Sequence, residues 1–476
     1  MGDRQIGSRD PAGVAKIWSN AHRAATGMAS NPVLPTAWRY GYSVEVRLTV
    51  RIVVSGFGLA WAAAAQALLP PDVLLLARVK SHMQQELARL PNCSCLETVR
   101  RDRKPAGGVM RPLDTVRVEV LYSDRHELYA SPGDRSFSDH QPIDFVGSGT
   151  IGNGQFALVL SEVTAERGPS YEYKGAELVS GRRLARYDYH VPLSISGNTI
   201  DLPEGRGTVG MKGSFWADPT SYDIVRIVTE AEDIPPQLPV SASETSIDYR
   251  HTSLDGHDFL LPQSADSRLV RFSGEESRNH IEFTHCRLYG AESSISFGDH
   301  QGIPLFGASS VLQLKREVLP ALHIVVKLST RITDKTVVGT LIEGVVDGNV
   351  LSKRSLVIPD GSPVRGRVRR LEWHDEKGGY FVVALEFTEV ETAGTRYRFF
   401  ADLEGTDGLA GLVQTIRPQQ HPSKSPVRSS GTTVDSSDEI LYLPDLPGVG
   451  SFFVQSRQLD LEPGFRMTWK TRALVR

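Results

Sequence analysis

The residue types that could do chemistry are scattered along this chain rather than gathered in a recognised motif. The serine-hydrolase elbow G-x-S-x-G, the zinc motif H-E-x-x-H and the P-loop are all absent. The histidines lie in or beside strand-like segments, where a surface or hydrogen-bonded role is the usual one; they include His190, His251, His257, His280 and His285. The sequence therefore predicts a protein that is not an enzyme, with no catalytic residue, no metal and no cofactor.

One glycine-rich stretch has the spacing of a dinucleotide-binding loop. Gly147, Gly149 and Gly152 form G-x-G-x-x-G after the strand-like segment 142–146 and before a predicted helix at 155–166. Such a loop needs strand–helix units that build a parallel sheet, but the segments that follow read as hairpins. We therefore interpret these glycines as turn residues with positive φ rather than as a nucleotide site.

Four arginines cluster late in the chain, at positions 365, 367, 369 and 370. Alternate positions of a strand share one face, so Arg365, Arg367 and Arg369 could form a patch for an anion or a phosphate headgroup. The alternative is a solvated strand face, partly paired with acidic neighbours. We favour that alternative; the expected partners are Glu372, Asp375 and Glu376.

Three cysteines lie in strand-like segments, which makes them candidates for a single disulfide. Cys93 and Cys95 are two residues apart and share one face, and Cys286 is far away in the sequence. Outside the cytosol thiols tend to pair. We expect a bridge from Cys95 or Cys93 to Cys286 and take Cys95–Cys286 as the structural disulfide; three unpaired buried thiols are the alternative.

The composition is that of a globular protein. The chain has 476 residues, a net charge of −3, 23% charged and 40% hydrophobic residues. This length predicts two or three domains. The balance excludes a generally nucleic-acid-binding protein, a multi-span membrane protein and a disordered chain, so no nucleic-acid partner is expected.

The N-terminal region reads as a leader for export. Arg47 and Arg51 precede an apolar run over 52–69, and Ala63, Ala65 and Ala67 supply small residues for cleavage after Ala65 or Ala67. An uncleaved membrane anchor is the alternative, and translation could also start later, for example at Met28. The predicted location is periplasmic or extracellular.

Downstream of the leader, one helix precedes a run of hairpins. Apolar residues recur at intervals of three and four over 72–90, with Asp72 as the expected N-cap. Alternating strands then fill 93–297, with turns at 218–221, 255–257 and 275–277. A long helix beside an antiparallel meander must cover one face of the sheet. The predicted fold is mainly β (α+β): a helix-supported antiparallel half-barrel.

A second β-rich block follows a connector at 301–320. Short strands over 323–403, with turns at 347–348, 360–361 and 376–379, indicate a small β-barrel-like domain. The strand-like segment at the end of the chain is expected to return and close this barrel. The predicted domains are thus a leader (1–67), a half-barrel (70–300) and a barrel-like domain (321–476) with a Ser/Pro-rich flexible insertion at 418–438.

The first block resembles the LolA/RseB-like group of Gram-negative envelope proteins, which includes lipoprotein carriers. The helix feeding a meander carries the resemblance, together with the hairpin GSFWADPTSYDIVRI at 213–227. The resemblance implies a half-open barrel with an apolar concavity that takes an acyl chain or a peptide. The segments SLVIPDGSPVRGRV (355–368) and TWKT (468–471) are faintly similar to the periplasmic barrel subunit of conjugation and type IV secretion channels.

From these features we expect an exported, non-catalytic envelope protein that binds a lipid, a lipoprotein or a peptide. The alternatives are a docking subunit of an envelope assembly, with an envelope protein as partner, and an exported hydrolase with an unrecognised site. Aromatic residues are the candidate ligand contacts, although most of them are expected to lie in the core: Phe156, Tyr171, Tyr173, Tyr187, Tyr189, Phe215 and Trp216.

Overall fold

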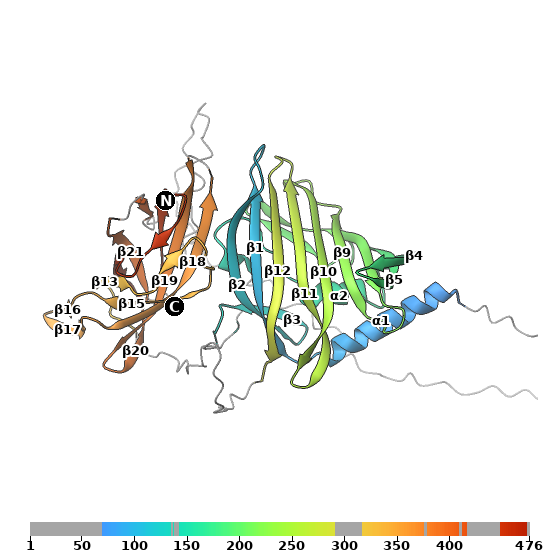
Figure 1. Ribbon diagram of the computed structural model, residues 1–476, viewed down its shortest axis with the longest axis horizontal. Helices are drawn as coiled ribbons and strands as arrows, with labels where there is room; N and C mark the ends of the chain where they lie inside the picture. Colours follow the sequence, from blue (N-terminus) through green and yellow to red (C-terminus); the bar gives the residue numbers. More distant parts are fainter. Residues whose placement is uncertain are drawn as a thin grey trace, which may run out of the picture. The chain divides into compact units, whose positions relative to one another are not determined.

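Two antiparallel sheets dominate the described part of the chain (Figure 1). The computed structural model describes residues 69–134, 137, 142–290, 317–375, 378–408, 412–416 and 448–473. The predicted leader, most of the connector and the insertion at 418–438 lie outside these residues. The chain from Leu68 to Arg476 forms one compact unit, and the predicted division into domains stays a prediction.

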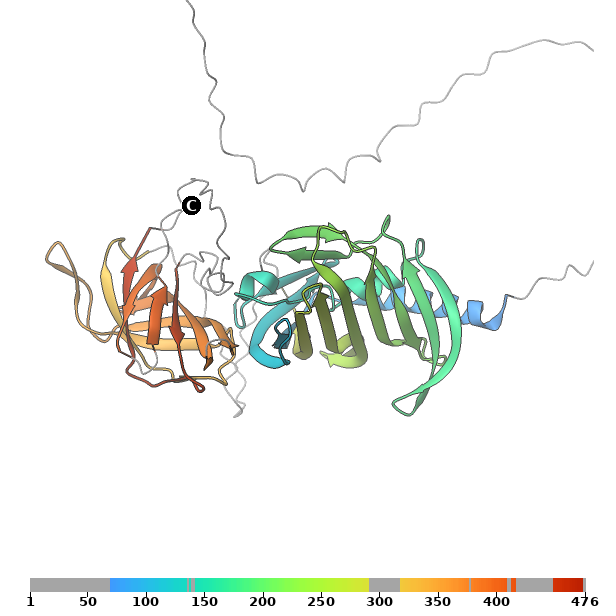
Figure 2. The ribbon, with the colours of Figure 1, turned by 90° about the horizontal axis from the view of Figure 1, so that it is seen from above.

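The first sheet has ten strands in the order β3-β2-β1-β12-β11-β10-β9-β8-β5-β4. Its strands are β1 (Cys93–Lys104), β2 (Arg111–Ser123), β3 (His126–Ala130), β4 (Ser170–Val179), β5 (Arg182–Val191), β8 (Gly210–Ala217), β9 (Ile224–Glu232), β10 (Val240–Leu254), β11 (His257–Arg271) and β12 (Glu276–Leu288). Figure 2 shows that this sheet is strongly curved. The predicted mainly β fold with an antiparallel half-barrel is confirmed.

Turn residues explain most of the strand boundaries. The predicted turn at 218–221 joins β8 to β9, and the turn between β10 and β11 has positive φ at Asp255 (51°) and Gly256 (82°). These are the conformations that a tight hairpin requires. The predicted turn at 275–277 lies instead at 272–275, because β12 already begins at Glu276.

The helix α1 spans Pro71–Arg89, and the N-cap prediction was wrong. The cap is Pro70, which provides no side-chain hydrogen bond, and Asp72 lies inside the first turn. A proline at the first helical position and an acidic residue in the first turn both suit a helix start. No helix among the described residues is long and apolar enough to cross a bilayer.

The second helix, α2, is shorter than expected: it spans only Leu158–Val163 and follows a 3₁₀ turn, η1 (Pro142–Phe145). Its start is determined by a carboxylate from β3. Glu127 accepts hydrogen bonds from the backbone N–H groups of Gly154, Ala157 and Leu158 at 2.8, 2.9 and 3.3 Å. This distant cap satisfies N–H donors at the helix start, which have no partner within the helix.

The second sheet has nine strands, in the order β21-β25-β13-β15-β18-β19-β23-β22 with β20 paired to β19. They are β13 (His323–Leu328), β15 (Leu341–Val346), β18 (Pro363–His374), β19 (Tyr380–Thr392), β20 (Thr395–Arg398), β21 (Ala401–Thr406), β22 (Leu412–Ile416), β23 (Val449–Val454) and β25 (Arg466–Thr471). The late strand β25 pairs with β13, the first strand of the block. β21 lies close to β22 and β23 at the other end of the order, so the sheet curls toward closure.

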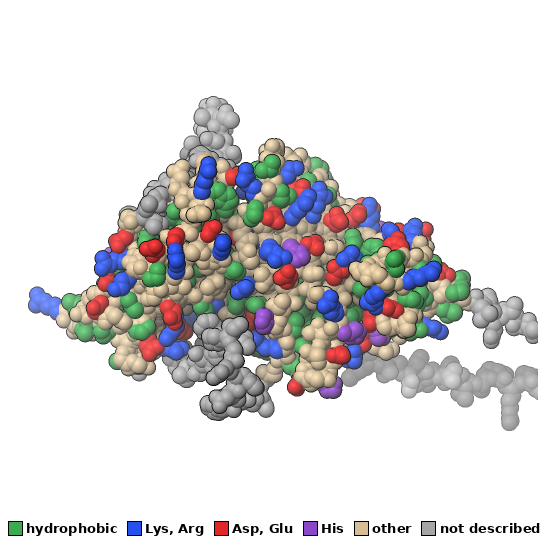
Figure 3. Space-filling model, in the orientation of Figure 1, with side chains coloured by type: hydrophobic (Ala, Val, Ile, Leu, Met, Phe, Trp, Pro, Cys, Tyr) green, Lys and Arg blue, Asp and Glu red, His purple; other side chains and the backbone are tan. Residues whose placement is uncertain are grey.

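Three small hairpins or strand pairs complete the described structure. They are β6 (Thr199–Leu202) with β7 (Gly205–Thr208), β14 (Ile332–Thr333) with β24 (Asp460–Leu461), and β16 (Val350–Ser352) with β17 (Ser355–Ile358). On the face seen in Figure 3, charged side chains of both signs are interspersed rather than gathered into one field.

Buried charges link the two sheets. Arg101 on β1 donates two hydrogen bonds to Asp114 on β2, at 2.7 and 2.6 Å, and lies 3.8 Å from Glu372 on β18. Glu372 is fully buried and also accepts from Arg370 (2.6 Å) and from Ser148 (2.6 Å). Burial raises the pKa of Glu372, but the surrounding arginines and His374 outweigh it and lower the pKa below its usual range.

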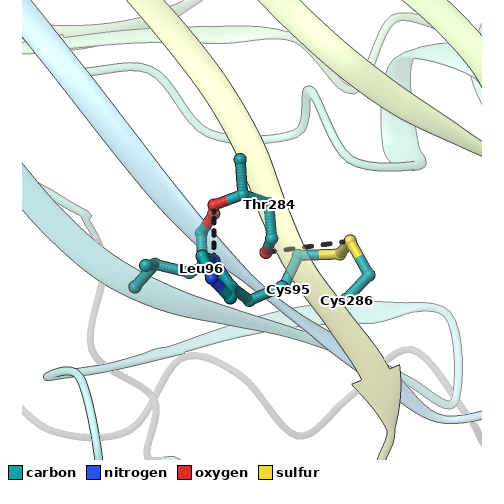
Figure 4. Close-up of a disulfide and its surroundings, with 5 residues drawn as sticks. Cys95, Leu96, Thr284 and Cys286 are labelled. Carbon is teal, nitrogen blue, oxygen red and sulfur yellow. Dashed lines mark hydrogen bonds between the residues drawn. A yellow bond between two sulfur atoms is a disulfide. The ribbon is translucent and has the colours of Figure 1, made fainter. Parts of the chain in front are cut away.

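A disulfide joins Cys95 to Cys286, 191 residues apart in the sequence (Figure 4). The register between β1 and β12 shifts between Ser94 and Leu96, and His285 has a positive φ of 51°. This bulge places two residues of β12 opposite one residue of β1, which brings Cys286 beside Cys95. Cys93 stays a free, buried thiol, and burial raises its pKa to about 12.

Removing this disulfide is expected to lower the free energy of unfolding by about 2–5 kcal/mol, since the bridge closes a long loop in the unfolded chain. The variant is Cys95→Ser/Cys286→Ser, compared with Cys93→Ala, which keeps the bridge. Chemical denaturation of both measures the difference. Alkylation of denatured, unreduced protein should modify one thiol, and modification of three would contradict the bridge.

Candidate ligand-binding site

The helix α1 crosses one face of the ten-stranded sheet, which we call the interior face. Its polar contacts run along the helix in the same order as the strands run from β5 to β11. From the first turn to the last, they are Tyr187 Oη to Asp72 O (2.7 Å), Arg78 Nη1 to Tyr222 Oη (3.1 Å), His82 Nε2 to Asp223 Oδ1 (2.8 Å) and Arg89 Nη2 to Asp258 O (3.0 Å). Figure 1 shows this oblique course of α1.

Few apolar side chains of α1 are fully buried. Val79 and Met83 have no exposed surface, and the Met83 sulfur accepts a hydrogen bond from the Ile224 N–H at 3.4 Å. Val73 and Leu74 in the first turns are 41% and 39% exposed. Most helical stability in proteins comes from a buried apolar face. Leu75, Leu76 and Leu87 are only partly buried against the same core, so α1 is a partly buried cover rather than a core helix.

A histidine pair holds α1 through one carboxylate. Asp223 follows the β8–β9 turn, and its two oxygens contact His82 of α1 at 2.8 Å and His251 of β10 at 3.1 Å. Burial raises the pKa of Asp223, but hydrogen bonds from Ser221, His82 and His251 outweigh this and lower it. Asp223 is therefore ionised at neutral pH and serves as the acceptor that latches the middle of α1 to the sheet.

The sequence analysis missed this latch. His82 and Asp223 are 141 residues apart, and neither belongs to a spaced motif. His251 was expected to be an ordinary strand residue with a surface or hydrogen-bonded role. Within the described residues, no group of three or more histidines, cysteines or carboxylates could hold a metal ion.

Four of the candidate aromatic residues form the layer beneath α1 and α2. Phe156, Tyr187, Tyr189 and Phe215 are at most 3% exposed. The rings of Tyr187 and Phe215 stack with centroids 5.3 Å apart, and the Tyr189 hydroxyl lies 2.7 Å from Thr229 Oγ1. They are core residues of the interior face, so a ligand would meet them only after α1 moves.

The other three candidate aromatics lie elsewhere. Tyr171 is half-buried and donates a hydrogen bond to Val163 O at 2.7 Å, and Tyr173 is 40% exposed on the edge strand β4. Trp216 alternates with Phe215 and faces the opposite side of the sheet, where its indole N–H donates to Glu177 at 2.8 Å. Trp216 is thus not an interior ligand contact.

An apolar rim lies where the first turns of α1 meet β4. The rings of Tyr173 and Tyr187 are 5.1 Å apart, and Tyr187 is hydrogen-bonded to the first turn of α1. Leu69, just before α1, and Val73 in its first turn are 56% and 41% exposed. These exposed apolar side chains lie next to the aromatic pair at this end of the helix.

The interior face also contains buried carboxyl groups. Glu97 on β1 is 1% exposed, and its Oε1 has no hydrogen-bond partner. Burial and the nearby Glu127 raise its pKa to about 8. Burial likewise raises the pKa of Glu127, despite the hydrogen bonds that it accepts. These groups make this part of the core sensitive to pH, and the sequence provided no signal for them.

The arginine cluster is paired with carboxylates, but of the expected partners only Glu372 takes part. Asp375 pairs with Arg111 instead, and Glu376 lies outside the described residues. Arg370 is buried against Glu372, while the other three are partly exposed. The remaining ion pairs are Arg365 with Glu343 and Glu391, Arg367 with Asp134, and Arg369 with Glu386. The cluster is therefore not a free anion patch.

The glycine-rich loop is explained by its neighbours. Gly149 has a φ of +71°, as expected, but Gly147 and Gly152 do not have a positive φ, so the prediction was wrong for these two. At Gly147, however, a Cβ atom would lie 2.6 Å from the Arg370 side chain, so this glycine is needed for close packing. The loop lies against the buried charges around Glu372, to which Ser148 donates its hydroxyl.

Comparison with known proteins reaches only the fold. No family model and no curated protein sequence matches the chain. Among solved structures, it is similar to a putative outer membrane lipoprotein-sorting protein domain from Vibrio parahaemolyticus (11% identity, TM-score 0.25, 46% of this chain and 94% of that chain). It is also similar to a DUF1329 family protein from Desulfovibrio piger (14% identity, TM-score 0.25, 46% of this chain and 95% of that chain). A LolA superfamily protein from Nitrosomonas europaea is similar too (11% identity, TM-score 0.23, 45% of this chain and 94% of that chain).

These neighbours include the superfamily that residues 70–300 were predicted to resemble. At these TM-scores the likeness carries no argument, so the half-barrel rests on the ten-stranded sheet of this chain and a ligand must rest on the geometry of the interior face. The fainter similarity of the second block to a secretion-channel subunit stays a prediction. The chain thus has a half-barrel sheet, and lipoprotein-sorting and LolA superfamily structures are among its structural neighbours.

Proposed function

We propose that this is an exported, non-catalytic protein that binds an apolar or extended ligand on the interior face of its half-barrel, beneath α1. The ligand class is a lipid, the acyl chain of a lipoprotein or a peptide. The observation that carries the proposal is the way in which α1 covers an aromatic and aliphatic face while fully burying only Val79 and Met83.

The energetics of exchange support a ligand with a long apolar part. Exposing Val79 and Met83 costs roughly 3–6 kcal/mol in total. Each buried methylene of a ligand contributes about 0.8 kcal/mol, so about eight methylenes offset that loss. An acyl chain of about eight methylenes therefore offsets the loss of Val79 and Met83. Further methylenes are needed to replace the partly buried Leu75, Leu76 and Leu87, and the proposed entry is near Tyr173.

Export is part of the proposal. The Cys95–Cys286 bridge supports it, because stable disulfides are rare in the reducing cytosol. The leader lies outside the described residues. A ligand that moves between membranes through an aqueous compartment would need a cover of the kind that α1 provides.

Loosening the latch of α1 is expected to strengthen ligand binding. His82→Ala removes one hydrogen bond that holds α1 closed, worth about 1 kcal/mol, so the open fraction and the apparent affinity should rise about fivefold. His251→Ala is the matched control, since it removes the other bond to Asp223 but does not lie on α1. Titration with a fluorescent long-chain fatty acid measures both variants.

Native mass spectrometry of detergent-free protein purified from its own cell envelope identifies the natural ligand. A bound lipid or peptide that is lost on denaturation is the expected result. If neither the wild type nor His82→Ala binds the fatty acid, and no bound species is found, the carrier proposal is wrong. Equal strengthening in His82→Ala and His251→Ala would show that α1 is not the cover that opens.

A further inference from the structure

We propose that the β16–β17 hairpin is a contact site for an anionic lipid bilayer. This inference goes beyond the proposed function, because it concerns the second sheet and needs no ligand in the half-barrel. The hairpin spans Val350–Ser352 and Ser355–Ile358 and forms a two-stranded sheet of its own. Figure 1 shows it projecting away from the neighbouring strands.

Two leucines form an exposed apolar pair on this hairpin. Leu351 and Leu356 are cross-strand partners and are 58% and 54% exposed. Cross-strand partners point to the same face, so the two side chains lie next to each other. Single exposed leucines are common, but a directly paired couple on a projecting tip presents a continuous apolar surface to whatever approaches it.

Two cations occupy the tip between these leucines. Lys353 and Arg354 are exposed, and no ion pair or hydrogen bond of either side chain is found among the described residues. This contrasts with the four arginines of β18, each of which has a carboxylate partner. The tip charge is therefore available to an external anionic group.

The backbone of the tip has a left-handed conformation that is costly for both of these residues. Lys353 has a φ of 48° and Arg354 a φ of 71°. A two-residue hairpin turn with both φ values positive strongly favours Asn-Gly or Asp-Gly. Lysine and arginine adopt this conformation only at a conformational cost, which points to a role for the side chains rather than for the turn.

The base of the hairpin is held firmly, so the tip has a defined position. The Gly348 N–H donates to Asp360 Oδ1 at 2.7 Å, and the Asp360 N–H donates to Asn349 Oδ1 at 2.9 Å. Val350 and Ile358, next to this base, are 6% and 2% exposed and belong to the core. The hairpin therefore holds an apolar pair and two cations outward on a rigid base.

An anionic bilayer matches both features of the tip. The interface of a membrane accepts apolar side chains just below its headgroups, and anionic headgroups attract lysine and arginine. Each basic residue near such a surface strengthens binding about fivefold, which corresponds to about 1 kcal/mol. Two cations should therefore provide about a 25-fold preference for anionic over neutral lipid.

The test compares vesicle binding by variants of the full chain. Vesicles of phosphatidylcholine alone and of phosphatidylcholine with phosphatidylglycerol are used, and the ratio of the two affinities is measured. The ratio cancels any membrane binding that does not depend on lipid charge. Lys353→Asn/Arg354→Gly introduces the favoured turn sequence, so it should keep or raise stability while the ratio falls about 25-fold.

Arg125→Gly is the matched control. Arg125 occupies the turn between β2 and β3, is exposed and has a φ of 66°. The cross-strand leucine pair of its hairpin, Leu121 with Leu128, is buried or half-buried rather than exposed. Its ratio should stay within twofold of the wild type. Leu351→Ser/Leu356→Ser should weaken binding to anionic vesicles and leave the salt dependence unchanged.

Three results would overturn the inference. The wild type could bind anionic vesicles no better than neutral ones, which would leave an acidic protein surface as the partner to examine. The tip variant could keep the wild-type ratio. Arg125→Gly could reduce the ratio about fivefold, the loss expected for any one basic residue near the membrane, which would indicate a general charge effect.

Discussion

Glu372→Ala is expected to lower the free energy of unfolding by about 3–5 kcal/mol, the loss typical of breaking a buried ion pair from one side. Glu372 has no exposed surface, and its carboxylate faces Arg370, Arg101 and the Ser148 hydroxyl. Without Glu372, Arg370, which is only 5% exposed, loses its carboxylate partner. Denaturant unfolding followed by circular dichroism measures the loss.

The control for this prediction is an ion pair on the surface. Glu282→Ala breaks the ion pair between Glu282 and Arg100. The Arg100 side chain is 55% exposed and the Glu282 side chain is 44% exposed. Exposed pairs contribute about 0–1 kcal/mol, so this variant should remain close to the wild type. Equal losses in the two variants would contradict the central role of Glu372 in joining β1, β2 and β18.

Glu97→Gln is expected to remove a loss of stability that the wild type suffers as pH rises. The folded protein holds the proton of Glu97 up to a pKa of about 8, whereas the ordinary pKa of a glutamate is 4.5. Between these values the folded state binds more protons than the unfolded state, so stability falls with rising pH. The contribution of this group is about 1.4 kcal/mol for each pH unit within the window.

The measurement is the free energy of unfolding at several pH values between 5 and 8 (roughly the window that the two pKa values define). The wild type should lose stability relative to Glu97→Gln across this range, because glutamine cannot ionise. Glu230→Gln, an exposed position on β9, serves as control and should follow the wild type. Parallel curves for the wild type and Glu97→Gln would show that Glu97 is ionised within the fold without penalty.

Local patterns in the sequence determined the elements of this protein. The spacing of apolar residues predicted α1, because a helix places positions three and four apart on one side. Alternation and turn residues predicted the meander, since strands alternate faces and tight turns such as that at Asp255 and Gly256 need positive φ. These signals act over a few residues, so they can be read from the sequence without knowledge of the fold.

The pairing of distant residues was decided only by the tertiary structure. Cys93 and Cys95 share one face, so the sequence could not choose between them with certainty; the bulge in β12 brings Cys286 beside Cys95. A second irregularity interrupts the pairing of β18 with β19 between Val368 and Arg370. A one-residue shift of this kind has no local signature.

The contacts of the candidate site, like the disulfide, depend on the tertiary structure. The contact of His82 with Asp223 exists because α1 crosses the sheet at the β8–β9 turn, and the pKa of Glu97 is raised because ten strands enclose its carboxyl group. Burial and long-range hydrogen bonding depend on how elements pack rather than on which residues stand next to each other. The sequence by itself therefore determined that a helix and a meander form, whereas packing determined what they hold between them.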